Sequence, residues 1–287
     1  MQYLLGTDIG TSGTKTVLMD ATGKLIAQDL QEYDVLTPKP LWAEQWPDVW
    51  YQGAVDSIKN TVAKAGVPAS GIKGIAISGL YGGSGIPLNA DMKPVRPCMI
   101  WMDRRANEET QWMLDTIGEE KLQRITRNGA DPYYGYTKIL WMKNHEPENW
   151  AKTALFLPPN DYVIYKLTGE VAIDYSSSGN IGGIFDMTAR AWSTELMDEM
   201  GIPVSMMPQR IVESTNIVGG LTAAATSMLE LKEGISVIAS GIDCGAANIG
   251  LGVFEPGVYA AAIGTSMCAA LISDKPVRGG DCVAIPL

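Results

Sequence analysis

Gly6-Thr7-Asp8-Ile9-Gly10-Thr11-Ser12-Gly13-Thr14-Lys15 is the stretch of this sequence that decides the fold. Its first half closes a short apolar run that begins at Tyr3, and its second half opens an alternating run that continues to Asp20. Two such runs joined by a glycine-rich turn are typical of a β-hairpin. A second turn at residues 21–24 leads into a third run at 25–33, so we predict a three-stranded meander at the start of the chain.

The turn at residues 10–13 has the composition of an anion-binding loop. Gly10 and Gly13 permit positive φ and let backbone N–H groups approach a phosphate. Thr11 and Ser12 add hydroxyl donors, and Lys15 adds a point charge that suits phosphate. The spacing is neither that of a Walker loop, G-x-x-x-x-G-K-[ST], nor G-x-G-x-x-G. An ordinary glycine–serine hairpin with an exposed lysine fits the same residues, so this segment alone leaves both interpretations open.

Two aspartates that follow apolar strands are candidates for chemistry. Asp8 ends the first strand, where a carboxylate can hold Mg²⁺ through its water shell, because that ion prefers oxygen ligands. Asp243 lies between a predicted strand at 235–239 and a predicted helix at 244–251, at an edge where α/β proteins bind ligands. In phosphoryl transfer such an aspartate orients the attacking hydroxyl and accepts its proton. A role as the N-cap of the helix fits Asp243 as well.

Strand and helix signals alternate through the rest of the chain. Apolar positions recur at helical spacing over residues 47–65, with Pro47 in the first turn. Compact apolar runs at 74–79 and 98–101 predict buried strands. We predict further helices over residues 107–117, 137–145, 161–167 and 193–200. Strands that alternate with helices indicate an α/β sheet protein.

A four-residue motif occurs near both ends of the chain. Ile9-Gly10-Thr11-Ser12 recurs as Ile263-Gly264-Thr265-Ser266, and each copy closes one apolar strand and opens another. This symmetry predicts two related units. Because a strand pair alone cannot bury a core, we expect a first domain at residues 1–253 and the severed start of a second domain at 254–287.

Composition excludes several classes of function. The 287-residue chain carries a formal net charge of −10, which argues against a nucleic-acid partner because phosphate backbones demand a basic surface. His145 is the single histidine, which excludes a multi-histidine metal site and any catalytic triad built on another histidine. It precedes Pro147 at the predicted end of a helix, where a cation suits the helix dipole. The chemistry must therefore rely on carboxylates, hydroxyls, backbone amides and a hard metal ion.

The sequence also predicts a cytoplasmic protein without membrane contact. No apolar run approaches the roughly 20 residues that span a bilayer. Residues 1–8 contain no basic side chain and reach a carboxylate at once, unlike a secretory signal. The 4 cysteines show no C-x-x-C spacing and no disulfide-framework density, which suits a reducing compartment.

Several segments together resemble the FGGY family of carbohydrate kinases and, within it, the xylulokinase branch. They occur in the family's order and extend over essentially the whole chain. Such a series is far more specific than one glycine-rich loop. The matching segments are residues 6–15, 42–50 (Trp-Ala-Glu-Gln-Trp-Pro-Asp-Val-Trp), 100–105 (Ile-Trp-Met-Asp-Arg-Arg), 138–147 (Lys-Ile-Leu-Trp-Met-Lys-Asn-His-Glu-Pro), 161–170, and the segments around Asp243 and 264–266.

The resemblance implies an α/β fold of the ribonuclease H-like, actin-like ATPase type, a mixed sheet flanked by helices with two domains around a cleft. It implies ATP-dependent phosphorylation of a sugar hydroxyl, with Mg²⁺ as cofactor and a ketose such as xylulose as the small-molecule substrate. Asp243 matches the family's catalytic base, beside the sugar, and forms the metal site with Asp8. The other carried-over positions are Gly10, Thr11, Ser12, Gly13 and Lys15 in the first phosphate loop, Gly264, Thr265 and Ser266 in the second, and Trp101 and Asp103 beside the sugar pocket.

The sequence departs from the family at the expected sugar pocket. Ser78-Gly79-Leu80-Tyr81-Gly82-Gly83 stands where xylulokinases have Ser-Gly-Gln-Met-His-Gly, so Tyr81 and Gly82 replace the Met-His pair that touches the sugar. Gly135 stands where the family usually has Pro, Ser or Thr. Sites built around hydrogen bonds discriminate strongly between substrates. Glycerol, ribulose and gluconate therefore stay open as alternative acceptors.

Three expectations concern the chain as a whole. The family's adenine site lies beyond the second phosphate loop, so we expect this polypeptide by itself to be inactive. A non-catalytic sugar-binding module and an actin-like ATPase that uses water as acceptor are the alternatives to a kinase. Retention of Asp8, Lys15 and Asp243 together argues against the binding module, because a pure binder needs none of them. The predicted assembly is a homodimer.

Overall fold

A six-stranded mixed sheet forms the centre of this protein, in a computed structural model that describes residues 1–80, 83–263, 267–275 and 283–286. The strand order is β13-β14-β5-β1-β2-β3, with β1, β5 and β14 parallel to one another. The strands are β1 (Tyr3–Ile9), β2 (Gly13–Asp20), β3 (Leu25–Glu32), β5 (Ile72–Gly79), β13 (Ile217–Gly220) and β14 (Ser236–Ile238). The predicted meander is confirmed as β1-β2-β3, and it forms one side of this sheet.

The two faces of the sheet differ in burial, as β1 shows. Leu5 and Ile9 are buried on one face, whereas Leu4 and Asp8 lie on the opposite face and are exposed. Successive side chains of a strand point to opposite faces. The alternating sequence of β1 therefore turns Asp8 away from the main core.

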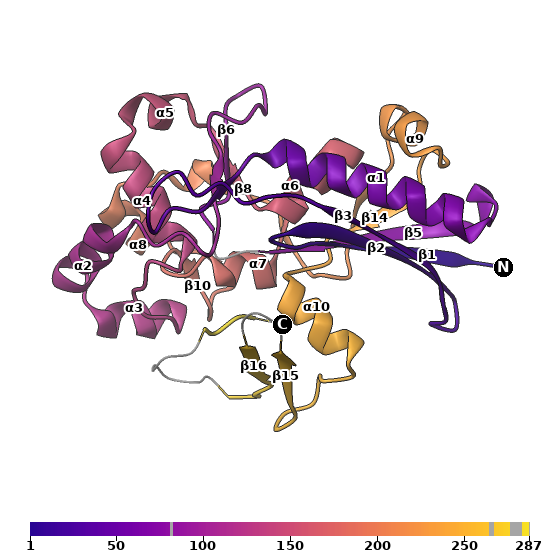
Figure 1. Cartoon of the computed structure of the whole chain (residues 1–287). Helices are drawn as coiled ribbons and strands as arrows, with labels where there is room; N and C mark the ends of the chain where they lie inside the picture. Colours follow the sequence, from indigo (N-terminus) through magenta and orange to yellow (C-terminus); the bar gives the residue numbers. More distant parts are fainter. Residues whose placement is uncertain (81–82, 264–266, 276–282, 287) are drawn as a thin grey trace.

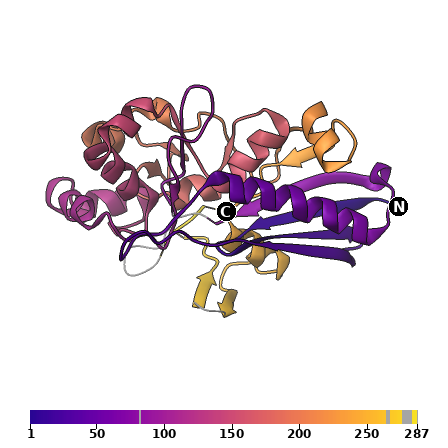
Figure 2. The same cartoon turned by 45° about the horizontal axis from the view of Figure 1, so that its top comes forward.

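Three helices cover the buried face of the sheet. They are α1 (Pro47–Ala65), α6 (Pro159–Thr168) and α9 (Ala223–Leu229), and Figures 1 and 2 show α1 lying along the sheet. Pro47 supplies the first turn of α1, and Gly66 ends the helix with a positive φ of 62°, a conformation that favours glycine. Trp50 and Ile58 are fully buried in the core between α1 and the sheet. The predicted helix at 47–65 is confirmed in type and in both bounds.

A second apolar core lies in a helical lobe beside the sheet, on the left in Figure 1. Met113, Leu140 and Met197 belong to this core. Among the described residues, no helix has both the length and the apolarity that crossing a bilayer requires. The helices of the lobe are α2 (Asn107–Thr116), α3 (Glu119–Thr126), α4 (Gly135–His145), α5 (Pro147–Lys152), α7 (Tyr175–Asn180) and α8 (Thr194–Met200).

Short strand pairs and two 3₁₀ turns connect these elements. The 3₁₀ turns are Ala69–Gly71 and Val204–Met206. The short strands form the pairs β4–β7, β6–β8, β9–β12 and β10–β11. Their bounds are β4 (Glu44–Gln45), β6 (Ile86–Leu88), β7 (Cys98–Met99), β8 (Leu155–Leu157), β9 (Ile173–Asp174), β10 (Phe185–Asp186), β11 (Ala191–Trp192) and β12 (Ile211–Val212).

The last elements lie on the side of the sheet opposite α1. They are α10 (Asp243–Gly250) and the hairpin of β15 (Tyr259–Ile263) and β16 (Met267–Leu271), drawn in yellow tones in Figure 1. Further on, the backbone of Ala284 makes two hydrogen bonds with the carboxamide of Asn128, at 2.8 and 3.0 Å. The described C-terminal residues therefore contact the helical lobe, next to the end of α3.

Candidate active site

The carboxyl ends of three parallel segments meet at one edge of the sheet. Ile9 of β1 pairs with Gly79 of β5, and Gly79 forms a bridge with Ile242, the residue before α10. Because these segments run parallel, the residues at their ends lie side by side. Asp8 and Asp243, which are far apart in sequence, are thereby brought to the same edge.

Asp8 lies between a hydroxyl and an ammonium group. Ser78 on β5 donates a hydrogen bond of 3.0 Å from its hydroxyl to Asp8 Oδ1. Lys15 is the residue opposite Asp8 in the β1–β2 register. Asp8 is open to solvent on one side, yet surrounding protein withdraws its carboxylate from water enough to raise its pKa, and the Ser78 hydrogen bond and the Lys15 charge only partly oppose this effect.

Asp243 is the first residue of α10, and Ile242 occupies the N-cap position. Its Oδ1 accepts a hydrogen bond of 2.6 Å from the backbone N–H of Cys244. The side chain is open to solvent on one side, yet surrounding protein withdraws it from water enough to raise its pKa to about 6. The Cys244 N–H opposes this shift, and the negative charge of Asp8 adds to it. The two carboxylates are therefore electrostatically coupled.

This pair of carboxylates fits Mg²⁺. The ion prefers oxygen ligands, keeps several of its waters, and is commonly held by one or two carboxylates together with substrate phosphates. Asp8 and Asp243 supply two oxygen donors whose mutual repulsion a cation would relieve. Within the described ranges no cluster of three or more His, Cys, Asp or Glu side chains could form an all-protein metal site. A partly hydrated ion suits this edge better than a fully enclosed one.

The turn at residues 10–13 is held by its own backbone and by Tyr33. The Gly10 N–H donates to the Gly13 carbonyl at 2.9 Å, and the Tyr33 hydroxyl donates to the Gly10 carbonyl at 2.8 Å. A Cβ atom at Gly13 would lie 2.9 Å from the carbonyl oxygen of Gln31, so that position requires glycine. Ser12 is exposed at the tip, where its hydroxyl is available to a ligand.

Two side chains from distant segments fix Thr11. The Trp101 indole N–H donates to the Thr11 hydroxyl, and the Gln45 carboxamide donates to the Thr11 carbonyl, both at 2.9 Å. Trp101 was expected beside the sugar pocket, and here it also contacts the expected phosphate loop. The sequence reasoning missed Gln45 as a site residue, although it lies within the matching segment at 42–50.

Asp103 is buried with a full set of partners. Its carboxylate pairs with Arg105 at 2.6 Å and accepts the backbone N–H of Ala43 at 2.7 Å. Arg105 in turn pairs with Glu44. These contacts hold the segment that carries Trp101, and a direct contact between Asp103 and a sugar stays a prediction.

Five predicted site residues lie outside the described residues. They are Tyr81 and Gly82 in the expected sugar pocket, and Gly264, Thr265 and Ser266 in the expected second phosphate loop. Their roles stay predictions.

Gly135, which departs from the family pattern, packs directly against Gly83, the last residue of the segment 78–83. A Cβ atom at Gly135 would lie 2.1 Å from the carbonyl oxygen of Gly83, and one at Gly83 would lie 2.4 Å from the carbonyl oxygen of Met99. Neither position has room for a side chain. Gly135, on α4, and the end of the segment 78–83 therefore depend on each other sterically.

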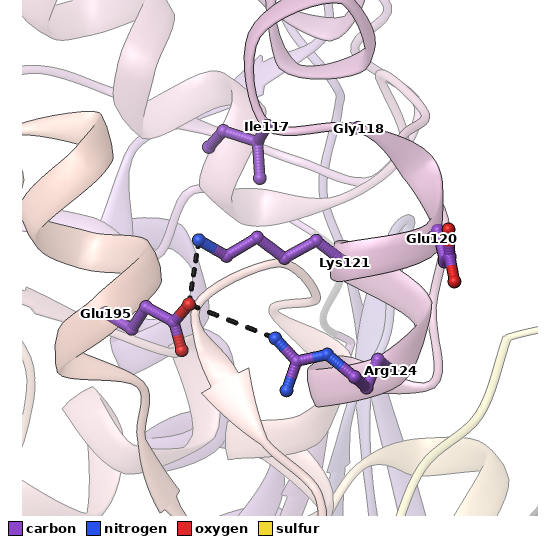
Figure 3. A pocket seen from close by; sticks show the side chains of 6 residues that line it. All are labelled: Ile117, Gly118, Glu120, Lys121, Arg124 and Glu195. Carbon is purple, nitrogen blue, oxygen red and sulfur yellow. Dashed lines mark ion pairs between the residues drawn. The ribbon is translucent and has the colours of Figure 1, made fainter.

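A surface pocket of about 470 Å³ lies away from this edge, between α3 and α8 (Figure 3). Lys121 pairs with Glu195 at 2.8 Å, and Arg124 approaches the same carboxylate at 3.9 Å. Exposed ion pairs of this kind contribute little energy. None of the six lining residues is a predicted site residue, so we place the candidate active site at the sheet edge.

Comparison with known proteins shows the family. The model of the FGGY family of carbohydrate kinases, N-terminal domain, matches residues 3–250. Xylulose kinase of Bacillus subtilis (strain 168) is 33% identical over 267 residues, which are 93% of this chain and 52% of that protein. The chain thus spans about half the length of the curated relatives it matches.

Solved structures show the same fold. A "xyloylose kinase" from Brucella ovis superposes with a TM-score of 0.87 at 31% identity, covering 93% of this chain and 54% of the other. Gluconate kinase from Lactobacillus acidophilus also reaches 0.87, at 24% identity with 93% and 53% covered, a likeness of fold alone. The expected ribonuclease H-like, actin-like fold with a mixed sheet is confirmed. The chain therefore belongs to the FGGY family of carbohydrate kinases, and its residues 3–250 match the N-terminal domain of that family.

Proposed function

We propose that this chain provides the sugar-binding domain of an ATP-dependent sugar kinase, with a ketose such as xylulose as the acceptor. The observation that carries the proposal is the coupled pair Asp8 and Asp243, which lies at the strand ends next to the turn at residues 10–13. The similarity to a xylulose kinase over 93% of the chain supports the choice of acceptor.

In this proposal Asp243 accepts the proton of the attacking sugar hydroxyl. A carboxylate with a pKa of about 6 is mostly ionised at neutral pH, yet it is more basic than an ordinary aspartate. The turn at residues 10–13, with the Ser12 hydroxyl at its tip, and Lys15 would bind phosphate oxygens. Mg²⁺ would be held by Asp8 and Asp243, and when bound it neutralises the charge on the β- and γ-phosphate oxygens. Residues 264–266 would complete the phosphate site.

The same proposal covers the organisation and location of the protein. Residues 1–253 would form the sugar-binding domain, and residues 254–287 would belong to the nucleotide-binding domain. A cytoplasmic location would give access to ATP, and the protein would act as a homodimer. Glycerol, ribulose and gluconate are second candidates for the acceptor because Tyr81 and Gly82 replace the Met-His pair of the expected pocket.

The test is a panel of ketoses, polyols and sugar acids assayed for sugar-dependent ADP release, using the full-length polypeptide in which these residues occur. We expect turnover with one class of sugar, and loss of turnover by at least about 10³-fold in Asp243→Asn, because an asparagine carboxamide cannot accept the proton of the sugar hydroxyl. Sugar binding by calorimetry should survive the substitution. Sugar-independent ADP release would indicate an ATPase instead, and sugar binding without any turnover would indicate a binding module.

A further inference from the structure

A buried serine makes one of the contacts that hold the segment leading into Asp243. We propose that Ser176 is a positioning residue, whose hydroxyl holds the Ile242 amide and so sets the direction in which the Asp243 carboxylate points. The catalytic consequence rests on the proposed function, whereas the contact itself does not.

The contact spans 66 residues of sequence and is fully buried. The backbone N–H of Ile242 donates a hydrogen bond of 3.1 Å to the Ser176 hydroxyl oxygen. The same hydroxyl donates its proton to Asp174 Oδ1. An amide N–H can only donate and a carboxylate can only accept, so the hydroxyl has one possible orientation between them. In the link from Ile242 through Ser176 to Asp174, each hydrogen bond therefore has a fixed donor and a fixed acceptor.

Asp174 is a firm anchor for this link. It ends β9, where it pairs with Val212 of β12, and it caps the first turn of α7. Its Oδ1 accepts the N–H groups of Ser176 at 2.8 Å and Ser177 at 3.0 Å. Its Oδ2 accepts the Ser177 hydroxyl at 2.5 Å. Because both oxygens of the Asp174 carboxylate accept hydrogen bonds, its orientation is fixed. The Ser176 hydroxyl that it orients therefore fixes the position of the Ile242 amide.

The chain before Asp243 packs directly on this anchor. A Cβ atom at Gly241 would lie 2.8 Å from the Ser176 hydroxyl oxygen. Upstream, the amides of Ala239 and Ser240 donate to the carbonyls of Asn216 and Ser214, at 2.9 and 2.8 Å. Those two bonds join backbone to backbone, and Ile242 also bridges Gly79 of β5, whereas the bond of the Ile242 amide depends on a side chain. A single substitution can therefore release it.

Ser177 provides a matched control. It bonds Asp174 through both its amide and its hydroxyl, as Ser176 does, and it is equally buried. No hydrogen bond described for Ser177 reaches residues 239–243. Ser176→Ala and Ser177→Ala thus each remove a hydroxyl from the same helix turn, and only the first removes the partner of the Ile242 amide.

The experiment compares these two variants in the full-length protein, by amide hydrogen exchange at Ile242 and by sugar-dependent steady-state kinetics. For Ser176→Ala we expect at least about tenfold faster exchange at Ile242, and kcat lower by about 10–100-fold with KM for sugar within about threefold, since a small misplacement of a reacting group costs this much. Ser177→Ala frees Asp174 Oδ2 but leaves the link from Oδ1 through Ser176 to Ile242 in place, so both effects should be several-fold smaller than those of Ser176→Ala. If Ser176→Ala does not fold, Ser176→Cys serves in its place, because a thiol is a weak acceptor for the amide.

Equal effects of the two alanine variants, or unchanged exchange at Ile242 in Ser176→Ala, would overturn the proposal. Faster exchange without a fall in kcat would overturn the catalytic part and show that the contact is only structural. A wild-type protein that turns over no sugar would refute the proposed function, and the exchange comparison would still decide whether Ser176 holds Ile242.

Discussion

The indole N–H of Trp101 donates a hydrogen bond of 2.9 Å to the hydroxyl of Thr11. The two residues are 90 positions apart, and they join the segment expected beside the sugar to the turn expected to bind phosphate. Both side chains are half-buried. A displacement of the segment that carries Trp101 would therefore strain or break its hydrogen bond to the turn that carries Thr11.

The first prediction concerns that contact. In a double-mutant cycle of Trp101→Phe and Thr11→Val, we expect a coupling in the free energy of unfolding of about 1 kcal/mol, the usual net value of such a bond. Urea denaturation measures it. Trp112→Phe, on the exposed side of α2, is the control and should not couple to Thr11→Val. Strict additivity of Trp101→Phe and Thr11→Val would contradict the prediction.

The second prediction concerns the titration of Asp243. In metal-free protein, ¹³C NMR of the carboxyl groups should show Asp243 with a pKa of about 6. Asp8→Asn removes the negative charge that helps to raise this pKa, so the midpoint should move to lower pH. Asp20→Asn, at the far end of β2 where it pairs with Tyr3, should leave it unchanged.

The raised pKa of Asp243 also predicts how activity and stability change with pH. As the base, Asp243 must be ionised, so kcat/KM should fall as pH is lowered through about 6. Because the folded-state pKa exceeds the ordinary value of 3.8, the folded state binds the proton more tightly, and stability declines as pH rises from 3.8 to about 6. A midpoint of Asp243 near 4 would contradict both expectations.

The third prediction concerns Gly135. Gly135→Ala places a methyl group 2.1 Å from the Gly83 carbonyl oxygen, so helix α4 or the segment ending at Gly83 must move. We expect a loss of about 1–3 kcal/mol in the free energy of unfolding, the usual cost of overpacking. Gly250→Ala, at the open end of α10 with nothing within 4 Å of the added atom, is the control and should change little. Equal stability of the two variants would show that α4 adjusts freely.

The fourth prediction concerns a buried carboxyl without a function in the proposal. Asp161 is buried in α6, its Oδ2 has no hydrogen-bond partner in the described part of the chain, and burial followed by repulsion from Asp174 holds its pKa well above 3.8. Its ionisation therefore costs stability increasingly as pH rises above 3.8. Asp161→Asn removes that cost and should raise the free energy of unfolding by about 1–3 kcal/mol at pH 8.

The same substitution should have a smaller effect at pH 5, where the wild-type carboxyl retains more of its proton. Denaturation at the two pH values measures the difference. Asp174→Asn is the comparison of opposite sign: it should destabilise the protein, because Asp174 accepts four hydrogen bonds from Ser176 and Ser177. A destabilised Asp161→Asn variant at pH 8 would contradict the prediction.

Local patterns determined much of this protein. Alternation and turn residues were enough to predict β1, β2 and β3, and helical spacing with Pro47 was enough to predict α1 in both its bounds. The strand-end positions of Asp8 and Asp243 also followed from local order, because a carboxylate after an apolar run lies where that strand ends. These features depend on residues within a few positions of one another, which is the range over which backbone preference and burial pattern act.

Tertiary structure decided the rest. The sequence analysis did not predict α7, whose residues Tyr-Ser-Ser-Ser-Gly-Asn are weak helix formers, and the helix exists because Asp174 caps it. The contact of Gly83 with Gly135, the attachment of Thr11 by Trp101, and the hold of Ser176 on Ile242 each join positions more than 50 residues apart. No local pattern encodes them, because chain packing alone brings such groups within hydrogen-bond or van der Waals distance.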